Sequence, residues 1–395
     1  MISVRQPIYD EFWRFAAERM LVFYRRALGL AEEGQPWTDD PILQEYKFTN
    51  TFRACDRLTQ FLIREVQPKS LNNDPQEMIF RSIVFRLFNS IDTFDALDDV
   101  CPDVAFEGIV AGGISTATFS PLVANAILNK RLEDGLTVYG NAYMHPSMKK
   151  DSGFEKKHHA HVDLLMKMIA DDLVDKIENA PSLKAIFDLL IEYPMIGKFI
   201  AYQMAIDINY TTAVDFSEND FTASGPGCDR GIDKCFTSVG RYKNEDVIKF
   251  MVDRQEYEFE RLGYHSSVVT LLGRKMHAID IQNVFCETDK YCRVKYPELT
   301  SDKSKIKSKF TPHGALTDLS HGTCGCGLSF PAKWGLGSLR ASFMTSKEGL
   351  PSSKLMYENK LLDYDRTWKF EREKPAPLPK VKELTEEEKM QGSLF

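Results

Sequence analysis

The sequence has 395 residues, of which 43% are hydrophobic and 27% charged, and its formal net charge is −7. These proportions are ordinary for a folded globular protein and exclude a chain that is disordered throughout. The negative charge argues mildly against nonspecific nucleic-acid binding, which depends on Lys and Arg. No window approaches the roughly 20 apolar residues of a membrane span, and charges interrupt the N-terminus, so we expect an intracellular protein without membrane contact.

Helical periodicity dominates the first 300 residues, because apolar side chains recur three and four positions apart. Only residues 134–143, with the sequence DGLTVYGNAY, alternate in the manner of a short strand. After residue 300 the periodic pattern gives way to Gly, Ser, Lys and Pro. We therefore predict a mainly α-helical body, residues 1–300, and an irregular extension with a charged tail, residues 301–395. The predicted helical stretches are 9–30, 42–66, 75–97, 150–194, 244–263 and 277–294.

Eight cysteines are spread over the chain, which is typical of reduced thiols in a large intracellular protein. Cys324 and Cys326 lie near His313 and His321 in the sequence. Their spacing departs from the usual C-x2-C pair of zinc sites, and no second pair completes four ligands. We therefore favour a glycine-rich turn over a metal site.

The stretch YPMIG, residues 193–197, interrupts two apolar helical runs. Pro194 ends one helix, Gly197 allows a tight turn, and the helix restarting at Lys198 offers free N–H groups to an anion such as a DNA phosphate. The arrangement resembles the helix-hairpin-helix of the DNA glycosylase superfamily, whose hairpin reads Leu-Pro-Gly-x-Gly. Met195 stands where that family prefers glycine. A plain turn that packs two helices together is the alternative.

Residues 50–57 combine amide, carboxylate and guanidinium groups. Asn50, Arg53 and Arg57 recur at intervals of three and four, so we expect them on one face of a helix that Asp56 borders. Two arginines suit bidentate binding of phosphate. A helix held by salt bridges is an equally weighted alternative.

Gly225 and Gly227 flank a proline, and we expect a loop there whose backbone comes close to a ligand. Arg230 and Lys234 follow and are available to neutralise an anion. The sequence contains no G-x-x-x-x-G-K-[ST] motif, so nucleotide binding by a P-loop is not expected.

Residues 277–294 predict a helix with one polar face, on which Asp280, Asn283, Glu287 and Lys290 recur three or four apart. Such a face suits a polar base or a phosphoryl group. It is equally compatible with a solvated surface.

Five segments, in this order, are similar to the DNA base hypermodification family of alpha-glutamyl/putrescinyl thymine pyrophosphorylase-like proteins, which also occurs as the helical domain attached to 5-hydroxymethyluracil DNA kinases. The resemblance implies a helical, DNA-glycosylase-like fold and the cytoplasm of a phage-infected bacterium. The resemblance covers roughly residues 9 to 297, and its segments read FWRFAAERMLVFYRR, PWTDDPILQEYKFTNTFRACDRLTQ, YPMIGKFIAYQMAIDINY, GPGCDRGIDKCF and IQNVFCETDKYCRVKY.

In the pathways of this family, a kinase pyrophosphorylates 5-hydroxymethyluracil in DNA, and a family member replaces the pyrophosphate with an amine. Because the sequence has no P-loop kinase module, the resemblance favours this transferase over the kinase. It implies DNA with a modified pyrimidine as a partner, a small amine as co-substrate, and an optional separate 5-hydroxymethyluracil DNA kinase. The sequence itself indicates no required cofactor and no metal. Two alternatives stay open: a DNA glycosylase, with Asp207 or Asp220 stabilising a cationic sugar, and a noncatalytic binder of modified DNA.

The resemblance also assigns roles to residues, with the target base turned out of the duplex. Asp207 and Glu287 are the candidates to deprotonate the amine, and Asn283 is the candidate to read the uracil edge. The hairpin residues Pro194, Gly197 and Lys198 would hold the DNA backbone, with Asp207 facing the base from the helix behind them. The candidates to bind pyrophosphate are Arg53, Arg57, Arg230, Lys234 and Lys290, and those that shape the site are Asn50, Asp56, Gly225 and Gly227.

Overall fold

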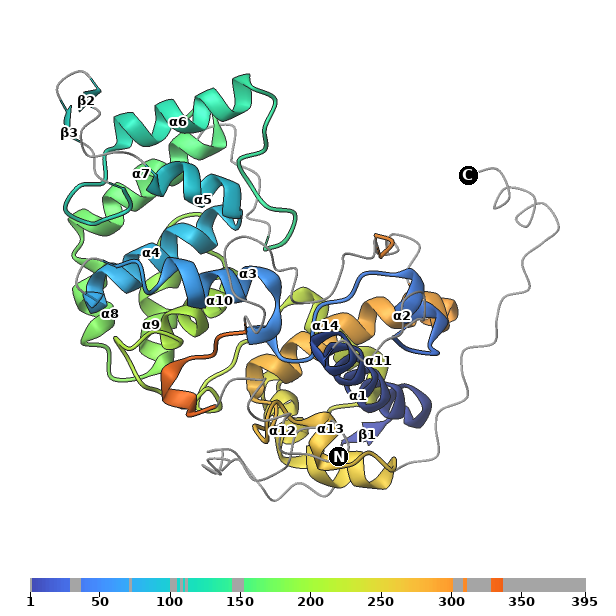
Figure 1. Cartoon of the computed structure of the whole chain (residues 1–395). Coiled ribbons are helices and arrows are strands. Elements are labelled where there is room, and N and C mark those ends of the chain that lie inside the picture. Colours follow the sequence, from blue (N-terminus) through green and yellow to red (C-terminus); the bar gives the residue numbers. More distant parts are fainter. Residues whose placement is uncertain are drawn as a thin grey trace.

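The computed structural model of the chain is mainly α-helical, as predicted, with little strand (Figure 1). Its helices form two lobes, each around its own hydrophobic core. The residues that the structure describes are 2–28, 37–70, 73–99, 105–106, 109–110, 113–143, 153–300, 308–310 and 328–336.

The first lobe joins the N-terminal helix to the last helices of the body (Figure 1). Its core is rich in aromatic rings, and Trp13 contacts both Phe12 and Phe259 edge to face. Two short antiparallel strands, β1 (Ser3–Val4) and β4 (Phe236–Ser238), tie the N-terminus to the end of α11. The helices of this lobe are α1 (Gln6–Leu28), α2 (Pro41–Glu45), α11 (Pro226–Cys235), α12 (Asn244–Arg261), α13 (Ser266–Val269) and α14 (Ala278–Lys295), followed by the 3-10 turn η4 (Pro297–Leu299).

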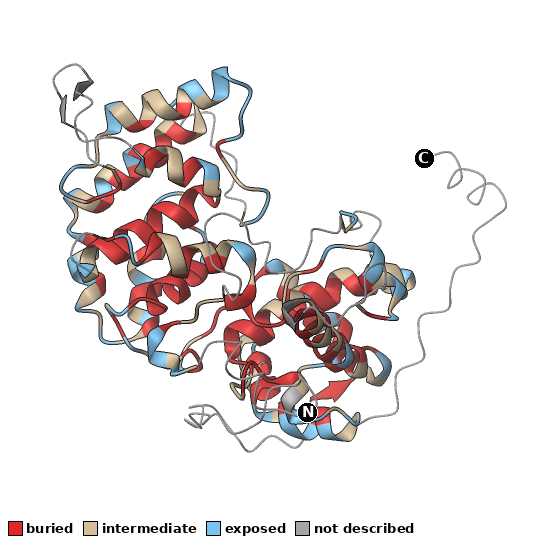
Figure 2. Cartoon of the chain, viewed as in Figure 1, coloured by how far each residue is buried: buried red, intermediate tan, exposed pale blue. Residues whose placement is uncertain are grey.

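The second lobe is built from the middle of the chain, and α4 lies at its centre (Figure 2). From residue 77 to residue 88 every side chain of α4 is buried, as expected of a helix that is apolar on most sides. Its helices are α4 (Pro75–Phe88), α5 (Ile91–Asp98), α6 (Pro121–Glu133), α7 (Lys157–Ala170), α8 (Leu173–Glu178), α9 (Leu183–Ile191) and α10 (Lys198–Asn209), and the strands β2 (Ala105–Phe106) and β3 (Ile109–Val110) pair beside them.

The chain passes from the first lobe to the second through three short turns and returns after α10. A nine-residue segment, 328–336, contacts both lobes, since Phe330 and Trp334 pack against both cores. The turns are η1 (Arg53–Cys55), α3 (Arg57–Phe61) and the π-helical η2 (Leu62–Val66), and segment 328–336 contains η6 (Ala332–Trp334).

The predicted strand at residues 134–143 is wrong, because this segment forms turns and bends. Its backbone groups bond to neighbouring helices instead of to a second strand: Gly140 N–H donates to Phe88 O, and Val138 O accepts from the Thr93 hydroxyl. The boundary predicted at residue 300 stays a prediction, since most of residues 301–395 lies outside the described residues. Among the described helices, none is both long enough and apolar enough to cross a membrane.

Candidate functional site

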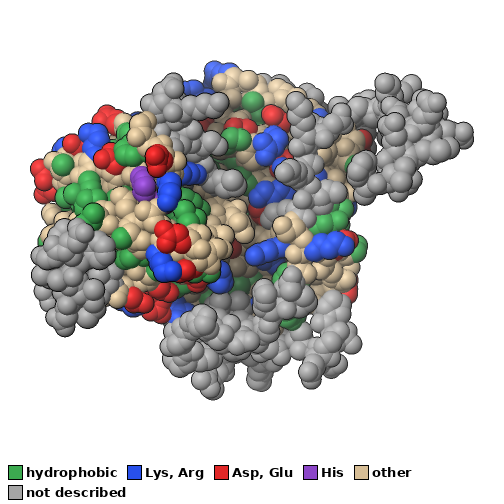
Figure 3. All heavy atoms as spheres, turned by 90° about the horizontal axis from the view of Figure 1, so that it is seen from above, with side chains coloured by type: hydrophobic (Ala, Val, Ile, Leu, Met, Phe, Trp, Pro, Cys, Tyr) green, Lys and Arg blue, Asp and Glu red, His purple; other side chains and the backbone are tan. Residues whose placement is uncertain are grey.

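The candidate site lies where the two lobes meet, along the polar face of α14. Seen from above, Lys and Arg side chains gather along the hollow between the lobes (Figure 3). Residue Arg53 marks this junction, because its N–H donates to Asp280 Oδ1 of α14 at 2.9 Å while its side chain reaches α10.

The hairpin between α9 and α10 forms as predicted, but through a different residue. Met195 takes the left-handed conformation, with φ of +66°, at the place where the related hairpin prefers glycine. Gly197 is extended, with φ of −85°, and no neighbouring atom approaches the position of its missing Cβ, so the turn does not require glycine there. Pro194, Gly197 and Lys198 are exposed. Their contact with the DNA backbone stays a prediction.

Asp207 is buried in an ionic network instead of facing a base from behind the hairpin, which corrects its expected position. Its oxygens lie 2.7 Å from Arg53 Nη1, 2.5 Å from Arg86 Nε and 3.1 Å from Arg86 Nη2. Burial opposes the charge of Asp207, but the two guanidinium groups outweigh it and lower the pKa of the carboxyl. Both oxygens are therefore occupied, and Asp207 holds η1, α4 and α10 together.

The same network corrects the expectation for Arg53, whose guanidinium binds Asp207 and Gln203 inside the protein in place of a phosphate. Asn50, Arg53 and Arg57 also do not share a helix face. Asn50 precedes η1, Arg53 begins η1, and Arg57 begins α3 as an exposed residue. The backbone of Asp56 is extended and separates the two turns, which breaks the helical spacing.

Six residues form the Asp56–Glu287 cluster: Thr49, Asn50, Asp56, Asn283, Glu287 and Lys290. Asn50 N–H donates to Asp56 Oδ1 at 2.8 Å, and Asn283 Nδ2 donates to Asn50 O at 2.9 Å. Glu287 accepts from the Thr49 N–H and pairs with Lys290 at 2.7 Å. The structure thus brings together the predicted residues Asn50, Asp56, Asn283, Glu287 and Lys290 across 240 positions of sequence.

Asp56 is the titratable group of this cluster with a pKa close to neutrality. Burial raises its pKa to about 6; the Asn50 N–H opposes the rise, and the charge of Glu287 adds to it. The side chain is half-buried and so is not sealed within a core. A carboxylate of this kind suits general base chemistry near neutral pH.

Two arginines of the site were missed by the sequence reasoning. Arg19 of α1 donates to Thr49 O and to Asn50 Oδ1, both at 3.0 Å, and so fixes the loop before η1. Arg86 completes the Asp207 network. The available signal was the same in both cases, an arginine within an otherwise apolar helical stripe.

The Gly-Pro-Gly segment is helical, which corrects the predicted ligand-binding loop. Gly225 precedes α11, and Pro226 opens it. A Cβ at Gly231 would lie 2.2 Å from Phe285 O, and a Cβ at Gly227 would lie 3.1 Å from Cys286 Sγ. These two glycines therefore serve the close packing of α11 on α14.

Arg230 and Lys234, expected to neutralise an anion, both pair with Asp289 of α14, at 3.1 and 2.7 Å. Lys234 is buried and Arg230 is exposed. Burial opposes the charge of Asp289, but Lys234 and Arg293 lower its pKa. Arg230 and Lys234 of α11 thus stabilise the contact of α11 with α14.

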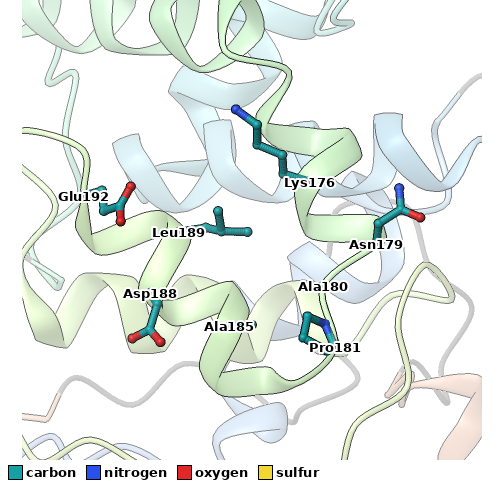
Figure 4. Close-up of a pocket in the computed structure, with 8 residues that line it drawn as sticks. All are labelled: Lys176, Asn179, Ala180, Pro181, Ala185, Asp188, Leu189 and Glu192. Atoms are coloured by element: carbon teal, nitrogen blue, oxygen red, sulfur yellow. The ribbon is translucent and has the colours of Figure 1, made fainter.

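A hollow of about 380 Å³ lies between α8 and α9, and no predicted site residue lines it (Figure 4). Lys176, Leu189, Asp188 and Glu192 are among its lining residues. Its charges are mixed, and Asp188 already pairs with Lys184 on the same helix. The hollow therefore indicates no particular ligand.

Metal ligation finds no support within the described parts of the chain, where no three His, Cys, Asp or Glu side chains are grouped to hold an ion. The candidates Cys324, Cys326, His313 and His321 lie outside the described residues.

Comparison with known proteins shows the family to which this chain is similar. The model of the family described as "5-hmdU DNA kinase, helical domain" matches residues 6–301. The 5-hmdU DNA kinase of Bacillus phage SP10 is 28% identical over 273 residues, which make up 65% of this chain and 41% of that kinase. The chain thus matches less than half the length of this relative. No solved structure matches the chain.

These matches overturn the expected replacement of pyrophosphate by an amine. Both descriptions name a kinase of 5-hmdU in DNA, and neither names amine transfer, base excision or passive binding. The expectation gave too much weight to the missing P-loop motif. The matched family is the helical domain of the kinase, and a helical domain need not carry that motif.

Proposed function

Because the chain belongs to the family of 5-hmdU DNA kinase helical domains, we propose that it takes part in phosphorylating 5-hydroxymethyluracil in DNA. The observation that carries the proposal is the match over residues 6–301, which includes the hairpin and the whole of α14. In this proposal the chain binds the modified pyrimidine and presents its 5-hydroxymethyl oxygen as the phosphoryl acceptor.

In this proposal the hairpin binds the DNA and the Asp56–Glu287 cluster receives the target base. The exposed hairpin and the N-terminus of α10 bind the DNA backbone. The target base leaves the stack, at a cost of a few kcal/mol, and its hydroxymethyl group reaches the cluster between the lobes. Aligning the acceptor oxygen is the larger part of catalysis in phosphoryl transfer.

Asp56 is the residue we assign as general base. It takes the proton of the hydroxymethyl group while the oxygen bonds to the γ-phosphorus of a nucleoside triphosphate and the bond to the diphosphate breaks. Lys290 lies beside Glu287 on α14 and adds positive charge near the transferred phosphoryl group. The sequence contains no Walker A motif, so the proposal assigns this chain the acceptor side of the reaction and a P-loop phosphotransferase the donor side.

Two measurements test the proposal. The first compares the affinity of the chain for oligonucleotides that are identical except for one 5-hydroxymethyluracil or thymine, by fluorescence anisotropy. One net hydrogen bond to the hydroxyl, about 1 kcal/mol, corresponds to roughly fivefold tighter binding of the modified DNA. The second incubates the modified DNA with ATP, Mg²⁺ and the chain, alone and with a P-loop kinase of 5-hmdU, and measures phosphorylated nucleosides by mass spectrometry.

The expected result is preferential binding of the modified DNA and a phosphorylated 5-hydroxymethyl nucleoside whose yield depends on this chain. Asp56→Asn should lower the yield, and Asp188→Asn, which removes a carboxylate on the distant α9, should not. Equal affinity for both oligonucleotides together with a yield that is independent of the chain would refute the proposal.

A further inference from the structure

Gln282 is a buried polar residue whose side-chain amide donor is not used within the described residues. It lies on α14 directly before Asn283 and is 2% exposed. Within the described residues, its Nε2 has no hydrogen-bond partner. A buried amide donor without an acceptor costs free energy, which an acceptor that binds beside it would offset.

The Nε2 atom faces the start of α11. A Cβ placed on Gly225, the residue that precedes α11, would lie 3.7 Å from Gln282 Nε2 and 3.0 Å from the ring of Phe199. Phe199 is the second residue of α10, so the N-termini of two helices of ten or more residues meet beside Gln282. The N-cap residues are Gly197 for α10 and Gly225 for α11, and neither provides a side-chain cap. The first N–H groups of both helices therefore have no partner within their own helix.

Aromatic rings lie beside Gln282 and the start of α11. Phe199 stacks on Tyr143, with ring centroids 5.6 Å apart and an interplanar angle of 18°. The buried cations Arg53 and Lys234 are already paired with Asp207 and Asp289. A neutral amide donor beside stacked rings suits the carbonyl oxygen of a flat base.

We propose that Gln282 donates a hydrogen bond to the 4-carbonyl oxygen of the pyrimidine, and so selects uracil over cytosine. The inference rests on the proposed function, which places the 5-hydroxymethyl group at the Asp56–Glu287 cluster. Atoms C4 and C5 are neighbours in the ring, and Gln282 directly precedes Asn283 on α14, where successive side chains point in different directions. The side chain of Asn283 contacts the cluster, while that of Gln282 contacts the start of α11.

The test uses three oligonucleotides of one sequence that carry 5-hydroxymethyluracil, 5-hydroxymethylcytosine or thymine, with affinities measured by anisotropy. Wild-type protein should prefer 5-hydroxymethyluracil over 5-hydroxymethylcytosine by about tenfold or more, the range of one good base contact. Gln282→Met, which keeps the side-chain length and removes the donor, should abolish this preference by weakening the uracil complex. Gln282→Glu should shift the preference toward cytosine, whose amino group needs an acceptor.

Thr288→Val is the matched control, because Thr288 is also buried on α14 and its hydroxyl also has no partner among the described residues. It should leave all three affinities unchanged. The proposal is overturned if Gln282→Met lowers all three affinities by one factor and reduces their salt dependence, which would assign Gln282 to the DNA backbone. It is also overturned if the variant leaves the ratios unchanged or only destabilises the fold, which would make Gln282 a cap of α11.

The two proposals fail separately in this design. Comparing 5-hydroxymethyluracil with thymine tests the 5-hydroxyl, and hence the proposed function. Comparing the two hydroxymethylated bases tests the 4-carbonyl, and hence Gln282.

Discussion

Asp207→Asn tests whether the buried ionic network of Asp207, Arg53 and Arg86 holds η1, α4 and α10 together. The substitution keeps the size of the side chain but removes the negative charge that Arg53 and Arg86 share. Two guanidinium groups, each at most 1% exposed, are then left without a counterion, and one of them meets an amide N–H in place of an oxygen. Removing one partner of a buried ion pair costs about 3 to 5 kcal/mol. This is a large share of the roughly 5 to 15 kcal/mol that stabilises a typical domain.

Urea unfolding at neutral pH is the assay, and the loss should appear as a lower midpoint with an unchanged slope. Asp188→Asn is the control, because its partner Lys184 is 60% exposed and such surface pairs contribute no more than about 1 kcal/mol. The pH dependence follows from the direction of the pKa shift. The folded state lowers the pKa of Asp207, so its contribution is present above the unfolded pKa and disappears as the pH falls through the folded value. A loss below about 1 kcal/mol at neutral pH would refute the assignment of a structural role.

Three further substitutions probe the turn, the helix contact and the proposed base. Met195→Ile should lower the free energy of unfolding by about 1 to 2 kcal/mol in chemical unfolding, because a branched side chain is strained at φ of +66°, whereas Met195→Gly should not; equal effects would refute the strained turn. Gly231→Ala should cost about 1 to 3 kcal/mol by the same assay, because its Cβ would push α11 off the carbonyl of Phe285, and a neutral effect would contradict this packing. Asp56→Asn should reduce phosphorylation by about 100-fold and leave the stability at neutral pH equal or higher. Since the folded state raises the pKa of Asp56 to about 6, its ionisation destabilises the fold as the pH rises through that value, and wild-type activity should rise over the same range; a flat pH profile would remove it as the base.

Periodicity alone was sufficient to predict the helical class and most of the helices, because apolar side chains three and four apart must face a core. It failed at residues 50–57, where the spacing of Asn50, Arg53 and Arg57 fits a helix but the chain turns twice. The reason is tertiary: Asp56 accepts the N–H of Asn50, and Asp280 accepts that of Arg53, so side chains replace the helical backbone bonds. The spacing of polar residues within 50–57 does not predict either of these hydrogen bonds.

The sequence predicted which charged residues lie at the junction of the lobes better than it predicted what each of them binds. Arginine binds a carboxylate and a phosphate with the same forked geometry, so a sequence with Arg53 and Asp207 fits both a phosphate site and an internal ion pair. Only the fold decides between them, and it places both residues in one buried network. The polar face of α14 is different, because Asn283 and Glu287 recur at helical spacing and a single face must carry them together. That face was therefore predictable, whereas its partners in the loop before η1 were not.

Segment 328–336 adds a contact that the helical body alone does not provide. It lies beyond the residues that match the family, yet Trp334 donates to Glu218, stacks under Arg274 at 3.8 Å and meets the ring of Tyr210 edge to face. Tyr210 in turn lies 5.8 Å from the guanidinium of Arg53, which belongs to the Asp207 network. The segment thus contacts the Asp207 network through the ring of Tyr210. Segment 328–336 therefore packs on both lobes at their junction and contributes no residue to the Asp56–Glu287 cluster.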